Sequence, residues 1–234
     1  MDPRLKKWID WLKVLHDEIQ QLVLAKDTFW EVQEIIKANK KIQKPSSFYK
    51  YLGNTYVSHS VIGMRRQLKV DSQSISLARL LTEMAETPKV VSRKYYKAMY
   101  ADSVVKDFAD KDFNRFAAPR AAHISKDMVL ADLKTLRDAG RKLEEYADRR
   151  VAHRDKRDIK SPPRFKDGDA FIELLDRLYV KYHLLFHAAS MDSLMPTYQY
   201  DWKEIFRDPW ISSEIEESNE SLNTDARDKA ARAG

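Results

Sequence analysis

Residues 144–165, with the sequence EEYADRRVAHRDKRDIKSPPRF, hold the side chains best suited to chemistry, and His153 lies at their centre. The cations and acids around it are Arg149, Arg150, Arg154, Lys156 and Arg157, with Asp148 and Asp155 between them. Repulsion from neighbouring guanidinium groups favours the neutral form of a histidine. Neutral imidazole is the general base that the 2′-hydroxyl of RNA requires, and guanidinium groups bind phosphate and stabilise charge building on it. The pattern therefore indicates a phosphodiester site that needs no metal, with Asp148 and Asp155 in supporting positions.

The helix that carries this stretch permits a second interpretation. Its apolar positions recur every three or four residues, at Val129, Leu133, Leu136, Gly140, Leu143, Ala147 and Val151. At about 100° per residue, roughly one third of the circumference on another face holds the remaining candidates, which are Tyr146, Arg149, Arg150 and His153. Cations also gather at helix C-termini because the helix dipole favours them there. The spacing by itself leaves both a charged helix end and a phosphate site open.

The composition allows regular structure around a core and fits a reducing cytoplasm. Of the 234 residues only 5 are Gly and 8 are Pro, whereas 43% are hydrophobic, so most of the chain can form regular structure around a core. The chain has no Cys, which excludes disulfides, thiolate zinc sites and Cys nucleophiles. It has neither a signal-peptide apolar core nor eighteen consecutive apolar residues. We therefore expect a soluble, cytoplasmic protein that has no membrane partner.

The formal net charge of +6 is unevenly distributed. Residues 141–166 carry ten Lys or Arg against five Asp or Glu, whereas residues 214–234 carry six acidic and three basic side chains. Most of the net positive charge thus lies around His153, where it suits a polyanionic partner such as RNA. A solvated helix end has a similar composition.

Helical periodicity dominates the chain, and no segment reads as a convincing strand. One amphipathic helix is expected from Leu5 to Val23, and a second is expected to start near Asp27. Further helices are expected after Ser46 or Ser47, after Ser74, over residues 91–116, after Ser125 and over residues 166–190. A short helix at residues 201–210 is expected to dock Trp202, Phe206 and Trp210 on the bundle. We predict one all-α domain, residues 1–212, and a polar, disordered tail, residues 213–234.

Other chemistries lack their motifs. The chain has no Glu-x-x-His pair, no Gly-rich phosphate loop and no His-Glu-x-x-His sequence. His183 and His187 are four residues apart, as in a two-histidine metal site, but their neighbours favour core or subunit-contact histidines. His59 and His123 are interpreted as satisfied polar groups among packed side chains. The sequence thus predicts neither a metal nor a cofactor.

Several segments together resemble the HEPN superfamily, and within it the AbiU-type branch named for abortive phage-infection proteins. The motif YADRRVAHRDKR, residues 146–157, follows a long amphipathic helix and precedes LYVKYHLLF, residues 178–186. SISLARLL, residues 74–81, and DWKEIFRDPW, residues 201–210, are also similar to that branch. The similarity spans roughly residues 10 to 210.

The resemblance implies an antiparallel multi-helix bundle with extra N-terminal helices and a short C-terminal docking helix, often assembled as a homodimer. It also implies a metal-independent endoribonuclease that acts as a toxin or antiviral effector. The family motif is an Arg followed by four to six residues and then His, which carries over to His153. The expected Arg falls at Ala147, so Arg149 or Arg150 would have to supply the cation.

Two functional hypotheses follow from this departure. In the first, the protein binds RNA and cleaves it with His153, Arg149 and Arg150, while Tyr146, Arg154, Lys156 and Arg157 hold the RNA. In the second, the chain is a catalytically degenerate HEPN module whose basic patch binds either a protein, such as an antitoxin or a phage-defence partner, or the acidic tail of the chain itself. Ala147 at the expected Arg position motivates the second hypothesis.

Overall fold

The computed structural model describes residues 1–101, 103–152 and 161–210, with the backbone alone at 151 and 152. The chain divides into two units, Met1–Pro196 and Thr197–Gly234, and each is described by itself. The helices of the first unit are α1 (Pro3–Ala38), η1 (Lys40–Ile42), α2 (Ser47–Leu68), α3 (Leu77–Glu86), η2 (Pro88–Val90), α4 (Arg93–Ala98), η3 (Lys106–Phe108), α5 (Ala109–Phe113), α6 (Lys126–Tyr146), η4 (Ala147–Ala152) and α7 (Phe165–His187). Within the described residues there is no strand, only an isolated bridge between Ser92 and His123. The predicted all-α class is confirmed.

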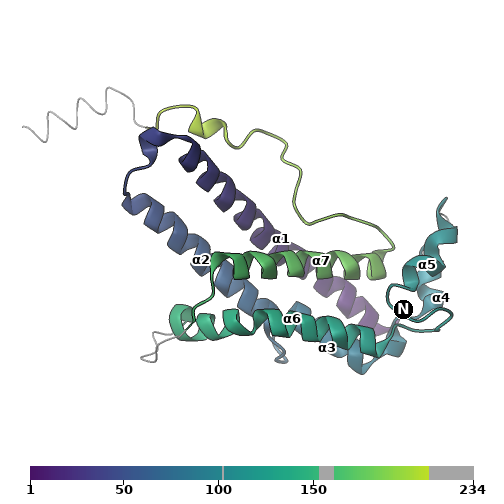
Figure 1. Cartoon of the computed structure of the whole chain (residues 1–234). Helices are drawn as coiled ribbons and strands as arrows, with labels where there is room; N and C mark the ends of the chain where they lie inside the picture. The colour runs from purple at the N-terminus through teal and green to yellow at the C-terminus, as the bar shows by residue number, and fades with distance from the viewer. Residues whose placement is uncertain (102, 153–160, 211–234) are drawn as a thin grey trace, which may run out of the picture. The chain divides into compact units, whose positions relative to one another are not determined.

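The first unit is a bundle of two antiparallel helix pairs with shorter helices at one end (Figure 1). Helices α1 and α2 form one pair, and α6 and α7 form the other. Helix α1 packs on α2 and α7, while α6 packs on α2, α3 and α7. The core between them is apolar and includes the fully buried side chains of Trp8, Leu12, Leu136, Phe171 and Leu175.

Helix α1 differs from the expectation of two successive helices. It is continuous over 36 residues, and its N-cap is Asp2, whose carboxylate accepts a hydrogen bond from the backbone N–H of Arg4 at 2.8 Å. The segment around Asp27 contains neither Gly nor Pro to interrupt the helix. Its side chains instead bind α7, since Lys26 Nζ lies 2.5 Å from Glu173 Oε1. The predicted restart near Asp27 was therefore wrong.

Serine caps set the starts of four later helices, among them α4, where Ser92 accepts from the backbone N–H of Tyr95 at 3.1 Å. Ser46 accepts from the backbone N–H of Phe48 at 3.2 Å and starts α2, and Ser125 accepts from Met128 at 3.3 Å and starts α6, as predicted. The cap of α3 is Ser76 rather than the predicted Ser74. The Ser74 hydroxyl donates instead to Asp71 at 2.7 Å, in the turn that precedes the helix.

Residues 91–116 do not form the single helix that was expected. They divide into α4, η3 and α5, and Val104 and Val105 between them are exposed. β-Branched residues after a serine are poor helix formers, which favours a break at this point. The short helices are joined by Arg93, whose guanidinium donates to Asp110 Oδ1 at 3.1 Å and to Asn114 Oδ1 at 2.9 Å.

Gly140 of α6 packs closely against Leu68 of α2. A Cβ atom added there would lie 2.5 and 2.7 Å from the two methyl groups of Leu68 and 3.0 Å from Phe171 Cε2. Gly53, in the middle of α2, would place its Cβ more than 4 Å from any neighbour. The two helical glycines therefore differ in their surroundings, although both positions favour alanine by helix propensity.

We expect Gly53→Ala to raise the free energy of unfolding by up to about 1 kcal/mol, the helix-propensity difference. Gly140→Ala should lower it by about 1–3 kcal/mol, because the buried Leu68 has to move or change rotamer. Urea unfolding followed by circular dichroism measures both. A Gly140→Ala protein at least as stable as Gly53→Ala would contradict the close packing of α6 on α2.

The described part of the second unit contains the short helix η5 (Glu204–Phe206). Phe206 contacts both of the tryptophans predicted to dock: the Trp202 and Phe206 ring centroids are 6.2 Å apart, and those of Phe206 and Trp210 are 5.9 Å apart. The docking of these rings on the bundle stays a prediction. So does the boundary at residue 212, and the tail, residues 213–234, lies outside the described residues.

Candidate nucleic-acid interface

The basic motif begins where helix α6 changes its hydrogen-bonding pattern. Directly after Tyr146 the chain continues as η4, a π-helical turn over Ala147–Ala152. Such turns are rare in proteins and are frequent at functional sites. The helical-wheel prediction assumed an uninterrupted α-helix, so its angles do not hold beyond Ala147.

Ala147 is fully buried, with 0% of its surface exposed. The other described apolar positions of the predicted stripe are buried too, namely Val129, Leu133, Leu136, Gly140 and Leu143. The stripe is thereby confirmed as far as Ala147, and the position of the family arginine is a packing position in this chain. A guanidinium attached there would have no direct access to RNA.

Two ion pairs involve Asp148 and Arg149 of the turn. Arg149 Nη1 lies 3.0 Å from Glu145 Oε1, one turn earlier on the same helix. Asp148 Oδ1 accepts a hydrogen bond from Arg65 Nε of helix α2 at 2.5 Å. Arg65 thus brings a guanidinium to the motif from a helix 83 residues earlier in the sequence. Together with Arg149 and the exposed Arg150, three guanidinium groups belong to this turn or contact it.

Arg65 was missed by the sequence interpretation. Its contact with Asp148 is tertiary, and no helical spacing connects the two positions. The available signal was the pair of adjacent arginines, Arg65 and Arg66, in the last turn of α2. Their roles differ, since Arg66 Nη1 lies 3.8 Å from Glu18 Oε1 of α1 and not at the motif.

The remaining predicted site residues cannot be placed. His153, Arg154, Asp155, Lys156 and Arg157 lie outside the described residues. Of the predicted catalytic and RNA-binding side chains, the structure therefore describes Tyr146, Arg149 and Arg150, and the supporting Asp148.

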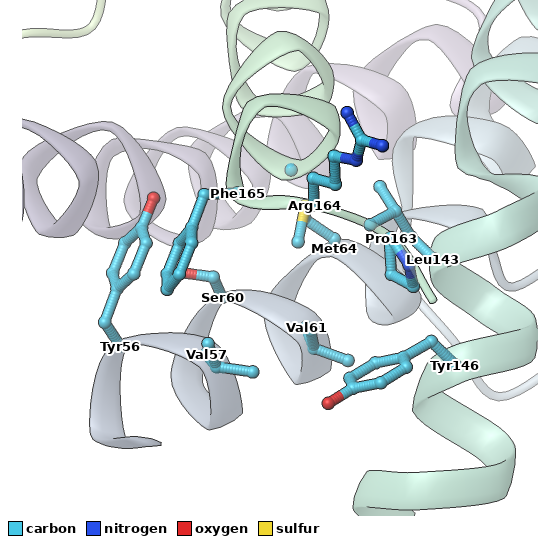
Figure 2. Close-up of a pocket in the computed structure, with 11 residues that line it drawn as sticks. Tyr56, Val57, Ser60, Val61, Met64, Leu143, Tyr146, Pro163, Arg164 and Phe165 are labelled. Atoms are coloured by element: carbon cyan, nitrogen blue, oxygen red, sulfur yellow. The ribbon is translucent and has the colours of Figure 1, made fainter. Parts of the chain in front are cut away.

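Tyr146 is half-buried and packs on the core, although the sequence placed it on an outward face with Arg149. It follows Leu143 by three residues, so it lies only about 60° from the buried stripe. With Leu143 it lines a cavity of about 350 Å³ between α2, α6 and the start of α7 (Figure 2). The sequence interpretation did not anticipate this cavity, because its walls come from three separate segments.

The opposite wall of the cavity consists of Tyr56 and Phe165, whose rings stack at a centroid distance of 6.1 Å. Asp169 of α7 fixes this wall by accepting from the Tyr56 hydroxyl at 2.8 Å and from Trp30 Nε1 at 3.0 Å. Burial raises the pKa of the Tyr56 phenol, and the hydrogen bond to Asp169 raises it further. Tyr56 therefore remains a neutral donor at physiological pH, and three helices meet at one carboxylate.

The described histidines outside the basic motif do not lie among clustered arginines. The rings of His183 and His187 are neighbours on α7, with centroids 4.7 Å apart. Partial burial lowers the pKa of His187, and His183 lowers it further. His59 is exposed, and His123 Nδ1 is buried without a hydrogen-bond partner among the described residues, so neither is the satisfied, packed histidine that was expected. No group of three or more metal-binding side chains occurs within the described ranges.

The all-α architecture, with a basic histidine motif in the sequence between helices α6 and α7, fits a HEPN-like helical bundle. The sequence profile of the HEPN family described as AbiU2 matches residues 5–205. The chain therefore belongs to the AbiU2-type HEPN family, as its motifs predicted. No curated protein and no solved structure shows a significant match to it. In the portion of the chain that the structure describes, no helix is long and apolar enough to cross a membrane.

Proposed function

We propose that this protein is a defence or toxin-type HEPN protein of the cytoplasm that binds RNA at the turn η4 and cleaves it without a metal. One observation carries the proposal: Arg65 is held at the turn by Asp148, beside Arg149 and Arg150 of the turn itself. Guanidinium groups bind phosphate with paired hydrogen bonds, so a turn that carries two arginines and contacts a third suits a phosphate ligand. The Arg that is missing at position 147 thereby has a candidate replacement from another helix.

In the proposed reaction, His153 accepts the proton of an RNA 2′-hydroxyl, and the 2′-oxygen attacks the adjacent phosphorus. The bond from phosphorus to the 5′-oxygen breaks, that oxygen takes up a proton, and a cyclic 2′,3′-phosphate remains. Arg65, Arg149 and Arg150 stabilise the negative charge that builds on the phosphate oxygens. Arg154, Lys156 and Arg157 extend the contact to neighbouring phosphates. A homodimer would bring two copies of this motif together.

The binding half of the proposal can be tested separately from cleavage. We expect the double variant Arg149→Ala/Arg150→Ala to bind single-stranded RNA more weakly in chelator-containing buffer. Removing two phosphate contacts should also make the affinity less sensitive to salt. The slope of log affinity against log salt concentration, which is negative, should decrease in magnitude by about 1–2. Lys134→Ala/Arg137→Ala removes the same charge from earlier turns of α6 and should leave affinity and slope close to wild type. Equal salt slopes in all three proteins would contradict an RNA site at η4.

The burial of Ala147 favours a second candidate, a HEPN module that binds a protein partner such as an antitoxin and has lost catalysis. This candidate predicts that wild type leaves RNA intact in any buffer and that its basic turn binds an acidic protein surface. Restoring an arginine by Ala147→Arg is not a clean test. The new charge would have to enter the core or distort the turn, and both are destabilising.

A further inference from the structure

The cavity beside the basic turn is built from side chains that suit a flat, partly polar ligand. Tyr56 and Phe165 stand on one side and Tyr146 on the other, while Val57 and Val61 of α2 form an apolar floor between them (Figure 2). Its volume of about 350 Å³ lies at the small end of the range for ligand pockets. Phe165 is 45% exposed, although it stacks on Tyr56, so part of its surface remains available to a ligand.

One polar atom in the cavity has no partner. The Ser60 side chain lines the cavity, the residue is 3% exposed, and its hydroxyl makes no hydrogen bond within the described residues. The Ser60 hydroxyl lies near the Tyr56 phenol and lowers its pKa, while the Tyr56 hydroxyl itself donates to Asp169. A buried hydroxyl without a partner is unfavourable, so a ligand with a polar edge would gain a hydrogen bond there.

The cavity and the basic turn are adjacent along two helices. On α2, Met64 lines the cavity and the next residue, Arg65, contacts Asp148. On α6, Tyr146 lines the cavity and the next residue, Ala147, begins η4. A ligand that combines an aromatic group with a nearby phosphate therefore matches both features at once.

We propose that this cavity binds one unstacked nucleobase of a single-stranded RNA, with its polar edge at the Ser60 hydroxyl. Proteins that recognise single-stranded RNA commonly stack its bases on aromatic side chains and hydrogen-bond their edges. A lipid tail would leave Ser60 unpaired and gain nothing from the guanidinium groups next to the cavity. The inference rests on the proposed function, since it specifies how RNA would be held beside the phosphate-binding turn.

The test compares a six-nucleotide single-stranded RNA with an abasic ribose-phosphate oligomer of the same length, by fluorescence anisotropy in chelator. Wild type should bind the RNA more tightly than the abasic oligomer. Phe165→Ala should weaken RNA binding by about 5- to 100-fold, the usual contribution of one stacked base, and leave abasic binding unchanged. Phe165→Trp keeps a stacking surface and should retain affinity. Tyr51→Ala, on an exposed ring of the same α2 helix, is the matched control.

Ser60→Ala provides a second test, because it should maintain or raise thermal stability while it lowers RNA affinity. The variant loses an unpaired buried hydroxyl, so its melting temperature should equal or exceed that of wild type. Its affinity for RNA should nevertheless fall. Its affinities for the four RNA homopolymers, each made of a single type of base, should also differ less from one another than those of wild type. A Ser60→Ala protein that binds every homopolymer as wild type does would overturn the role of the hydroxyl.

The outcomes separate this inference from the proposed function. If wild type binds the RNA and the abasic oligomer equally, the cavity takes no base and the inference fails, while phosphate binding at η4 stands. If wild type binds neither, the proposed function fails as well. If Phe165→Ala changes the oligomeric mass and leaves RNA affinity unaltered, the cavity receives a side chain from a second copy, which also overturns the inference.

Discussion

Replacing His153 by Ala is expected to lower the rate of RNA cleavage by about 10²- to 10⁴-fold, the usual contribution of a positioned general acid or base. RNA affinity should stay close to wild type, because a neutral imidazole contributes no net charge to phosphate binding. The measurement is single-turnover cleavage of a fluorescent RNA in chelator, paired with anisotropy on an uncleavable 2′-deoxy substrate.

His59→Ala is the matched control, because His59 is exposed on α2 and lies outside the motif. Equal cleavage by wild type and His153→Ala would remove His153 from the mechanism. An inactive wild type that still binds an acidic protein partner would instead favour the non-catalytic module.

Arg65→Ala is expected to reduce cleavage by about 10²- to 10³-fold, as loss of one group that stabilises transition-state charge typically does. The neighbouring variant Arg66→Ala should have little effect, since Arg66 pairs with Glu18 and not with the motif. Arg65→Lys should recover only part of the activity, because an ammonium keeps the charge and loses the planar, two-pronged geometry.

A loss of folding stability would not explain the expected difference in cleavage rate between Arg65→Ala and Arg66→Ala. The Asp148 side chain is 47% exposed, so water can solvate its carboxylate once Arg65 is removed. Ion pairs with that much exposure contribute little to folding. Equal melting temperatures of the two variants would confirm this point. Equal cleavage by Arg65→Ala and Arg66→Ala would exclude Arg65 as the replacement for the family arginine.

The sequence was most informative where the relevant contacts are local. Helix starts at Ser46 and Ser125 follow from caps that bond within three residues. The buried stripe through Leu143 and Ala147 follows from the helical period, and that burial explains why the family arginine has no counterpart at position 147. The family itself was recognised from segments that span most of the chain.

The sequence was least informative where structure depends on distant or irregular contacts. Arg65 reaches Asp148 across two helices, and the cavity needs walls from three segments, so no linear pattern contains either feature. The turn η4 departs from the α-helical period that a helical wheel assumes. Tyr146 lies at the border of the buried stripe. A small change in its angular position around the helix axis determines whether its side chain faces solvent or the core.

The ion pairs of the turn also determine how selective it can be. Arg65 is held by Asp148 and Arg149 by Glu145, so an arriving phosphate competes with a carboxylate that is already in place. The electrostatic attraction of the turn for an arbitrary polyanion is correspondingly weaker than its number of guanidinium groups implies. A ligand that also gains binding energy from contacts outside the turn can displace the carboxylates from the guanidinium groups. A ligand that offers only negative charge is at a disadvantage. In the proposed RNA complex the two carboxylates would therefore compete with the phosphate for the guanidinium groups, so recognition would depend on the shape of the ligand as well as on its charge.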